Sequence, residues 1–198
     1  MTKIVLYMSM SVDGFIAGPD DSMEHGLGVN GARLHDWLRD GDGSPGSHRP
    51  TTGPSVDAFD EAMGTGAVIV GRRTFEFAQG WGGDHHNGVP IFVLTRKAPA
   101  EPAPGHARYV VDGIESCVAQ ARSAAGGRDV LVHGAATGQA LLRAGLLDEL
   151  QLHLVPVLLG QGRRLFDDSP AETIELDPVR AVEAPGVLHL RYRVKKER

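Results

Sequence analysis

The sequence predicts an α/β fold in which helices lie on both faces of a mixed, mostly parallel sheet. Short apolar runs rich in β-branched residues recur along the chain, and helical patterns separate several of them. Such an alternation is typical of parallel strands with helices packed on the sheet. The last part of the chain differs, because two extended segments flank a turn there. The chain is therefore expected to close with an antiparallel hairpin.

Six apolar runs bounded by Gly, Pro or Asp are predicted as buried strands. They cover residues 4–8, 67–70, 91–94, 108–111, 130–133 and 150–159. Apolar residues at helical spacing predict two helices, at 114–124 and 137–144, and Gly145 suits the end of the second. The closing hairpin is predicted from segments 173–183 and 187–195, on either side of the turn Ala184-Pro185-Gly186.

The composition excludes several classes of protein. Of the 198 residues, 41% are hydrophobic and 23% are charged, which excludes a disordered chain and a collagen-like fibre. The single cysteine, Cys117, excludes an intrachain disulfide and multi-cysteine zinc sites, and it favours a reducing cytoplasm. A formal charge of −5 argues against sequence-independent binding of nucleic acid. No apolar run approaches the ~20 residues of a membrane span, and Asp13 comes too early for a secretory signal.

The predicted elements form one domain over residues 1–198, with one polar insertion. Residues 39–54 are rich in Gly, Pro, Ser and Asp and cannot bury much apolar surface, so we expect a long mobile loop. A linker between two domains is the alternative. The segment before the insertion holds only one strand and a short amphipathic piece, which is too little for an independent core.

Three of the predicted strands end in turns that suit the binding of phosphate groups. Free N–H groups and the helix dipole attract anions where a strand leads into a helix, and small side chains let a pyrophosphate approach the backbone. The three turns contain Gly71, Arg72, Arg73 and Thr74, then Thr95, Arg96 and Lys97, and finally Gly134, Ala135, Ala136 and Thr137. Each turn alone also fits an ordinary connection with solvated cations. Together they favour a phosphorylated dinucleotide, although the spacing is not the G-x-G-x-x-G fingerprint.

A turn is also predicted directly after the first strand. Asp13-Gly14 is a turn signal, and the Asp13 side chain can bond nearby backbone N–H groups. In a nicotinamide-binding protein, Phe15 or Ile16 would form an apolar cover over the nicotinamide ring. Turn formation alone explains Asp13 equally well.

Nine histidines raise the question of a metal site, which the sequence does not support. His85 and His86 are adjacent in a loop rich in Gly and Asp, and neither H-x-x-x-H nor H-E-x-x-H occurs. Solvated loop histidines are therefore the preferred interpretation. A nucleophilic triad lacks support as well, because no G-x-S-x-G motif is present.

Four segments of the chain resemble the dihydrofolate-reductase-like superfamily. They are MSVDGFIAG, VIVGRRTFE, FVLTR and VLVHGAATGQALLRAGLLDELQLHLVPVLLGQGRRLF. The chain looks most similar to the reductase domain that forms the C-terminal part of the bifunctional riboflavin-biosynthesis deaminase/reductase, and the resemblance covers nearly its whole length. No segment resembles the zinc motif of the deaminase half. The resemblance implies a three-layer fold and the reduction of 5-amino-6-(5-phosphoribosylamino)uracil with NADPH.

The resemblance also implies which residues contact the cofactor. The phosphate-binding helix would begin at Gly71, Arg72, Arg73 and Thr74. The adenosine 2′-phosphate would lie near Thr95 and Arg96. The turn beneath the pyrophosphate and nicotinamide would be Gly134, Ala135, Ala136 and Thr137. The loop over the nicotinamide would contain Met10, Asp13, Gly14, Phe15 and Ile16.

Two features differ from the family pattern. The pyrophosphate turn commonly has two consecutive glycines, and the second is Ala135 here. Dihydrofolate reductases have an acid on the helix after the first loop, and the acids in that region are Asp36, Asp57, Asp60 and Glu61. The catalytic acid therefore stays open, with Asp13 and Asp57 as candidates. Trp81, in a Gly-rich stretch, is a candidate for stacking on the substrate.

The leading hypothesis is an NADPH-dependent reductase of a heterocyclic substrate. The alternatives on the same scaffold are a dihydrofolate or other pteridine reductase and a non-catalytic NADPH-binding dimeric domain. The long apolar strand predicted at 150–159, together with the pairing of related domains, predicts a homodimer. We expect no metal, nucleic acid or membrane as a partner.

Overall fold

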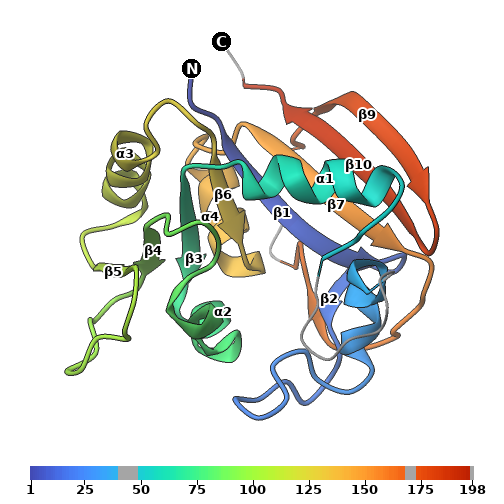
Figure 1. Cartoon of the computed structure of the whole chain (residues 1–198), viewed down its shortest axis with the longest axis horizontal. Helices are drawn as coiled ribbons and strands as arrows, with labels where there is room; N and C mark the ends of the chain where they lie inside the picture. Colours follow the sequence, from blue (N-terminus) through green and yellow to red (C-terminus); the bar gives the residue numbers. More distant parts are fainter. Residues whose placement is uncertain (40–48, 168–172, 197–198) are drawn as a thin grey trace.

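The computed structural model describes residues 1–39, 49–167 and 173–196, and within these ranges eight strands form one sheet (Figure 1). The strands lie in the order β5-β4-β3-β6-β1-β7-β10-β9. Their bounds are β1 Ile4–Ser11, β3 Ala67–Gly71, β4 Ile91–Leu94, β5 Ala107–Val110, β6 Val130–His133, β7 Glu149–Val155, β9 Leu176–Ala184 and β10 Val187–Val194. A second sheet pairs β2 (Phe15–Ala17) with β8 (Arg163–Arg164).

The eight-stranded sheet is mostly parallel. Strands β5, β4, β3, β6, β1 and β7 each run parallel to their neighbours, whereas β10 is antiparallel to both β7 and β9. The six parallel strands therefore end at one edge of the sheet, which we call the carboxyl edge. The α/β class, the mixed sheet and the closing hairpin predicted from the sequence are confirmed.

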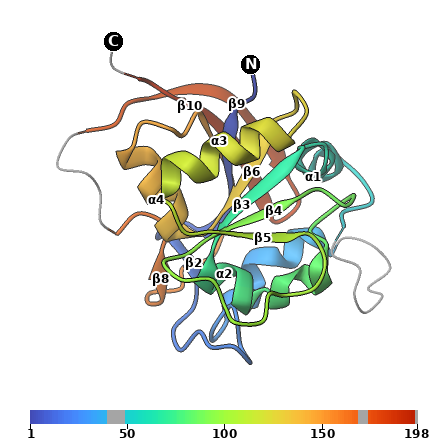
Figure 2. The ribbon, with the colours of Figure 1, turned by 90° about the vertical axis from the view of Figure 1, so that its left-hand side faces the viewer.

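Helices cover both faces of the sheet, as the sequence predicts. Helices α3 (Ile114–Ala124) and α4 (Ala135–Arg143) pack on one face, because their small and apolar side chains form a single stripe. Helices α1 (Pro54–Met63) and α2 (Arg72–Phe77) pack on the opposite face (Figure 2). The 3-10 segments η1 (Gly31–Leu38) and η2 (Gln79–Gly83) lie on the same face as α1. None of the helices in the described ranges is long and apolar enough to cross a membrane.

Several boundaries differ from the sequence-based expectation. Strand β7 ends at Val155 rather than at residue 159, because Pro156 has no N–H group to continue the ladder. Helix α4 begins two residues earlier than expected, directly after Gly134. The predicted loop at 39–54 ends at Gly53, since Pro54 occupies the first turn of α1, where proline is favourable. Residues 40–48 of that loop lie outside the described residues, so its mobility stays a prediction.

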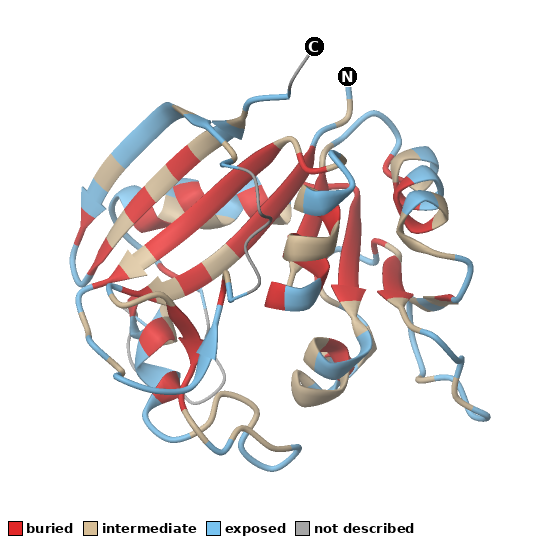
Figure 3. Cartoon of the chain, turned by 180° about the vertical axis from the view of Figure 1, so that it is seen from behind, coloured by how far each residue is buried: buried red, intermediate tan, exposed pale blue. Residues whose placement is uncertain are grey.

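One face of the C-terminal strands carries no helix among the described residues. Seen from behind, β7, β10 and β9 face outward without a helix in front of them (Figure 3). Half-buried apolar side chains lie on this side of the strands, and we call them the outer leucine face. They are Leu154, Leu188, Leu190, Tyr192 and Val194.

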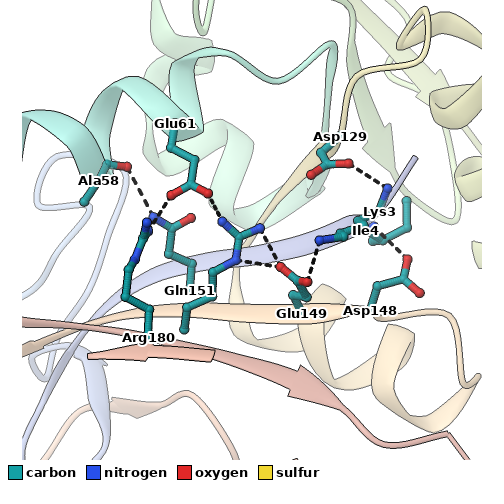
Figure 4. A network of polar contacts seen from close by, with 10 residues as sticks. Lys3, Ile4, Ala58, Glu61, Asp129, Asp148, Glu149, Gln151 and Arg180 are labelled. Carbon is teal, nitrogen blue, oxygen red and sulfur yellow. Dashed lines mark hydrogen bonds and ion pairs between the residues drawn. The ribbon is translucent and has the colours of Figure 1, made fainter. Parts of the chain in front are cut away.

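A buried ion-pair network holds α1 on the opposite side of the same strands (Figure 4). The Glu149 side chain on β7 is almost fully buried, and it accepts a hydrogen bond of 2.6 Å from Nε of Arg191 on β10. Lys3, just before β1, reaches the other oxygen of Glu149 at 2.8 Å. Arg191 also pairs with Glu61 on α1, and Glu61 in turn pairs with Arg180 on β9. The network therefore connects β7, β9, β10 and the residue before β1 to the helix that covers them.

We expect the substitution Glu149→Ala to lower the free energy of unfolding by about 3 kcal/mol, because it leaves the buried Arg191 guanidinium without its main partner. Urea denaturation measures this loss. Glu76→Ala is the matched control, since it breaks a pair with Arg72 in which both side chains are largely exposed, and it should cost less than about 1 kcal/mol. Equal losses in the two variants would contradict the structural role of the network.

Candidate functional site

Two of the predicted phosphate-binding turns contact each other at the carboxyl edge. Gly71 ends β3, Gly134 follows β6, and these two strands are neighbours in the sheet. A Cβ atom on Gly134 would lie 2.5 Å from the Thr74 hydroxyl oxygen, and one on Gly71 would lie 2.8 Å from the Thr137 hydroxyl oxygen. Each turn therefore needs a glycine where the other presents a threonine. The fold brings these four predicted residues together.

The turn after β6 has backbone features that suit an anion. Gly134 has φ +94°, a conformation that favours glycine, and α4 begins behind it without a side-chain cap. The first N–H groups of this helix have no partner within the helix, so they and the helix dipole suit a phosphate. Ala135, which replaces the second glycine of the family pattern, is 7% exposed and packs into the core beneath α4. Its methyl group therefore lies on the inner side of the turn.

The cations of the predicted cofactor site differ in their surroundings. Arg72 pairs with Glu76 at 2.6 Å, and Arg73 pairs with Asp21 at 2.9 Å. Arg96 is exposed at the end of β4 and forms no ion pair with any residue in the described part of the chain. Thr95 beside it closes a local turn, with its hydroxyl donating to the Lys97 carbonyl oxygen at 3.0 Å. Arg96 is thus the guanidinium with a free charge at this edge.

Asp13 fastens the loop after β1 to the segment after β7. Its carboxylate accepts hydrogen bonds from the Ser11 hydroxyl at 2.6 Å and from the N–H groups of Gly160 at 2.7 Å and Leu159 at 3.2 Å. These bonds, that of Ser11 above all, lower the pKa of Asp13 from 3.8 to about 2. At neutral pH the side chain is an ionised tether and holds no proton to give. The structure places it in the turn role that the sequence left open.

The residues after Asp13 are inside the protein rather than on a surface loop. Phe15 and Ile16 belong to β2 and are buried, and Met10 at the end of β1 is half-buried. The Arg164 guanidinium lies 4.4 Å from the centre of the Phe15 ring. Gly14 has φ +88° and provides the reversal that leads into β2.

The other candidate acids lie on exposed surfaces or in ion pairs. Asp57 is exposed in the first turn of α1, and Asp36 is exposed near Arg39 at 3.6 Å. Asp60 pairs with Arg49, and Glu61 belongs to the ion-pair network described above. Nothing in these contacts singles out Asp57 as a proton donor.

The interpretation of His85 and His86 as solvated loop residues is wrong. His86 is 8% exposed, and its Nδ1 lies 2.7 Å from Nδ1 of His85. Nε2 of His85 lies 2.8 Å from Nε2 of His133, the last residue of β6. Burial lowers the pKa of His85 to about 2 and that of His133 to about 4, so both are neutral at pH 7. The loop folds back so that His85 reaches the end of β6 and His86 reaches Thr65, just before β3. The Gly-rich and Asp-rich sequence of the loop does not indicate this burial. Within the described ranges, no group of three or more His, Cys, Asp or Glu side chains is arranged to hold a metal ion.

Trp81 extends this cluster. Its ring centre lies 4.6 Å from that of His85 and 5.5 Å from that of His133. Its backbone is left-handed, with φ 50°, which is unfavourable for a bulky residue and costs on the order of 1 kcal/mol. Strained residues of this kind gather at functional sites, so the geometry keeps Trp81 as a candidate for contact with a ligand.

A second histidine pair, which sequence reasoning missed, lies beneath α1 and η1. His153 on β7 and His189 on β10 approach with their Nδ1 atoms 2.7 Å apart. Trp37 of η1 lies with its ring centre 4.5 Å from that of His153, and Tyr7 of β1 lies at 4.4 Å. We call Tyr7, Trp37, His133, His153 and His189 the aromatic layer. The available signal was the polar residue at every second position of β7 and β10, but this pattern is also typical of a solvent-exposed face.

Comparison with known proteins gives a family match over almost the whole chain. The family model described as the RibD C-terminal domain matches residues 2–190.

Solved structures share the fold. A putative riboflavin biosynthesis protein from Shewanella sp. PV-4 superposes with a TM-score of 0.69 at 20% identity, covering 99% of this chain and all of the other. The diaminohydroxyphosphoribosylaminopyrimidine deaminase/5-amino-6-(5-phosphoribosylamino)uracil reductase of Thermotoga maritima gives 0.64 at 13% identity, over 98% of this chain and 57% of its own. Dihydrofolate reductase from Enterococcus faecalis, complexed with NADP(H), gives 0.55 at 14% identity, over 98% and 97% of the two chains.

We expect the Asp13 tether to stabilise the fold only while its carboxylate is ionised. Because the folded-state pKa of about 2 lies below the ordinary 3.8, this contribution is complete above pH 3.8 and is lost as the pH falls through about 2. The melting-temperature difference between the wild type and Asp13→Asn should therefore shrink between pH 4 and pH 2. Asp57→Asn, which removes an exposed carboxylate, is the control for net charge. A difference that stays constant with pH would contradict the tether.

Proposed function

The chain belongs to the RibD C-terminal domain family, a family of reductase domains, and from this membership we propose that it is an NADPH-dependent reductase of the riboflavin-biosynthesis type. The observation that carries the proposal is the contact between the two turns at the carboxyl edge. Both turns present small residues and hydroxyl groups, as a pyrophosphate site requires. The fold relatives include a protein complexed with NADP(H) and a uracil reductase, which supports the same assignment.

The residues present fit a phosphorylated nicotinamide cofactor. The uncapped start of α4 suits a pyrophosphate, and the Thr74 and Thr137 hydroxyls line the space where the turns meet. Arg96, which is exposed and has no ion-pair partner among the described residues, would hold the additional phosphate that distinguishes NADPH from NADH. When bound, the cofactor supplies the hydride. The chain's part is to bind and orient the two reactants and to exclude water.

We propose a planar heterocycle of the pyrimidine type as the substrate. The uracil reductase of Thermotoga maritima acts on such a ring, and Trp81 with its neighbouring imidazoles offers aromatic surface beside the proposed cofactor turn. Aromatic faces stack on planar ligands at little entropic cost because their rotamers are few.

We also propose that the protein is a homodimer that pairs through the outer leucine face. Its five half-buried apolar side chains carry no helix in the described part of the structure, and apolar faces of this kind mark contact sites between chains.

We expect Arg96→Ala to raise the dissociation constant of NADPH by about 10- to 100-fold, the loss of one charge-assisted bond to phosphate, while NADH binding changes little. Fluorescence titration with both nucleotides measures this. Arg128→Ala, an exposed arginine at the opposite edge of the sheet, is the matched control and should affect neither nucleotide. Absence of NADPH binding to the wild type would refute the cofactor, and an equal loss for both nucleotides would refute the role of Arg96.

For the dimer, light scattering should give twice the chain mass of 21.1 kDa. Leu188→Lys, on the outer leucine face, should shift the mass to that of one chain, because a charge in an apolar interface is costly. Val111→Lys, an exposed apolar residue just after β5, should leave the dimer intact. A wild-type mass of one chain would rule out the proposal.

A further inference from the structure

Two polar atoms in the middle of the aromatic layer are buried and have no hydrogen-bond partner within residues 1–39, 49–167 and 173–196. They are the Tyr7 hydroxyl oxygen and Nε2 of His153. A buried polar group left unpaired costs about 1–3 kcal/mol, so two of them in adjacent rings are a sizeable destabilisation. The two rings meet edge to face with their centres 4.4 Å apart. Buried groups of this kind normally have a partner, and a ligand can be that partner.

The neighbours of His153 determine whether its Nε2 is a hydrogen-bond donor or an acceptor. Its Nδ1 faces Nδ1 of His189, and Nε2 of His189 lies 3.1 Å from the Ser55 hydroxyl at the start of α1. A neutral imidazole has one donor and one acceptor nitrogen. The hydrogen bonds that join His153, His189 and Ser55 must therefore all be donated in the same direction, either toward Ser55 or away from it. If His189 donates to Ser55, His153 donates to His189 and presents Nε2 as an acceptor. If Ser55 donates instead, Nε2 of His153 becomes a donor.

The two unpartnered groups are uncharged. Burial raises the pKa of the Tyr7 phenol and, as the largest cause, lowers the pKa of His153 well below its ordinary value. The charged forms of His189, His35 and His133 lower the His153 pKa further, and among the described residues these three imidazoles are the titratable groups that act on it. The ligand edge that this pair matches is therefore neutral. A protonated amidine would instead call for a carboxylate partner.

The layer adjoins the proposed cofactor site on two sides. Its member His133 directly precedes Gly134 in the chain, and Tyr7 lies on β1, whose end leads into the Asp13 loop. Trp37 covers His153 and donates from its indole nitrogen to the Ser9 hydroxyl of β1 at 3.0 Å. A ring bound against Tyr7 and His153 would thus lie beside the strand ends that carry the predicted NADPH contacts.

We propose that Tyr7 and His153 recognise a neutral cyclic amide edge of the substrate, with the Tyr7 hydroxyl donating to a ring carbonyl and a ring N–H donating to Nε2 of His153. His189 and Ser55 are positioning residues that hold His153 in the acceptor tautomer. The proposal rests on the proposed reductase function and specifies which part of the substrate this chain reads. It also separates lactam rings from ring systems that present a cationic edge.

The first experiment compares two probes on the NADPH-bound protein by calorimetry. 5,6-Diaminouracil presents a lactam edge, and 2,4-diaminopyrimidine presents an amidine edge. We expect the wild type to bind the lactam more tightly. Tyr7→Phe should weaken lactam binding about tenfold, equivalent to about 1.4 kcal/mol, and leave NADPH binding and thermal stability unchanged or improved, since it deletes an unpaired hydroxyl. Tyr109→Phe, which removes a hydroxyl on β5, is the matched control.

The second experiment tests the positioning residues by ¹⁵N NMR of the imidazole rings. In the lactam complex, Nε2 of His153 should be unprotonated. Ser55→Ala removes the hydroxyl that accepts from His189, so both tautomers of His153 should appear and lactam affinity should fall. Ser55→Thr keeps a hydroxyl there and should restore the single acceptor tautomer of His153 and the lactam affinity. Thr65→Val, which alters the hydroxyl beside His86 in the other histidine pair, should change neither.

The outcomes separate the two levels of the proposal. If the wild type binds NADPH but not the lactam, or if Tyr7→Phe binds the lactam as tightly as the wild type, the assignment of Tyr7 and His153 is overturned and the reductase function stands. An unchanged His153 tautomer in Ser55→Ala overturns the positioning role. Failure of the wild type to bind NADPH overturns the proposed function, and this inference with it.

Discussion

The strict alternation of side chains along β7 and β10 is the constraint on which the rest of this structure depends. Alternate residues of the two strands point toward α1 and η1, and apart from Val155 and Val187 the buried ones are polar: Glu149, Gln151 and His153 on β7, and His189 and Arg191 on β10. The intervening leucines point to the other face. A core of this composition is destabilising unless each buried polar group forms a hydrogen bond or an ion pair. At one end of the strands the partners are ions, and at the other end they are imidazoles.

The two ends of this polar row therefore have different roles. Around Glu149, charges balance one another and connect α1 to β7, β9 and β10, and Gln151 adds a bond of 3.2 Å from its amide to the Ala58 carbonyl oxygen. Around His153, burial keeps the rings neutral and the pairing incomplete. The carboxyl edge of the parallel strands lies at that second end, where the glycine turns also meet. Stability and the proposed chemistry are thus separated along the length of the same strands.

Much of the fold could be predicted from local patterns. The bounds of β4, β6 and α3 agree with the sequence-based expectation, because apolar periodicity and Gly or Asp boundaries act within a few residues. Helix α1 was not predicted, because its buried face consists of the small residues Ser55, Ala58 and Ala62 and contains no large apolar side chain. Its position depends on Arg180 and Arg191, more than a hundred residues away in the chain.

For the site, the sequence by itself determined the strand-end turns, since a glycine or threonine after an apolar run has the same chemistry wherever the sheet places it. For Asp13, the sequence left a turn role and a catalytic role open. Only the tertiary structure decided that Gly71 lies against Thr137 and Gly134 against Thr74. It also decided that His85 and His86 are buried, and that His153 and Tyr7 have unpaired polar atoms among the described residues. The physical reason is that burial belongs to an environment rather than to a residue. The alternating sequence pattern of a strand is the same whether water or a helix covers its polar face.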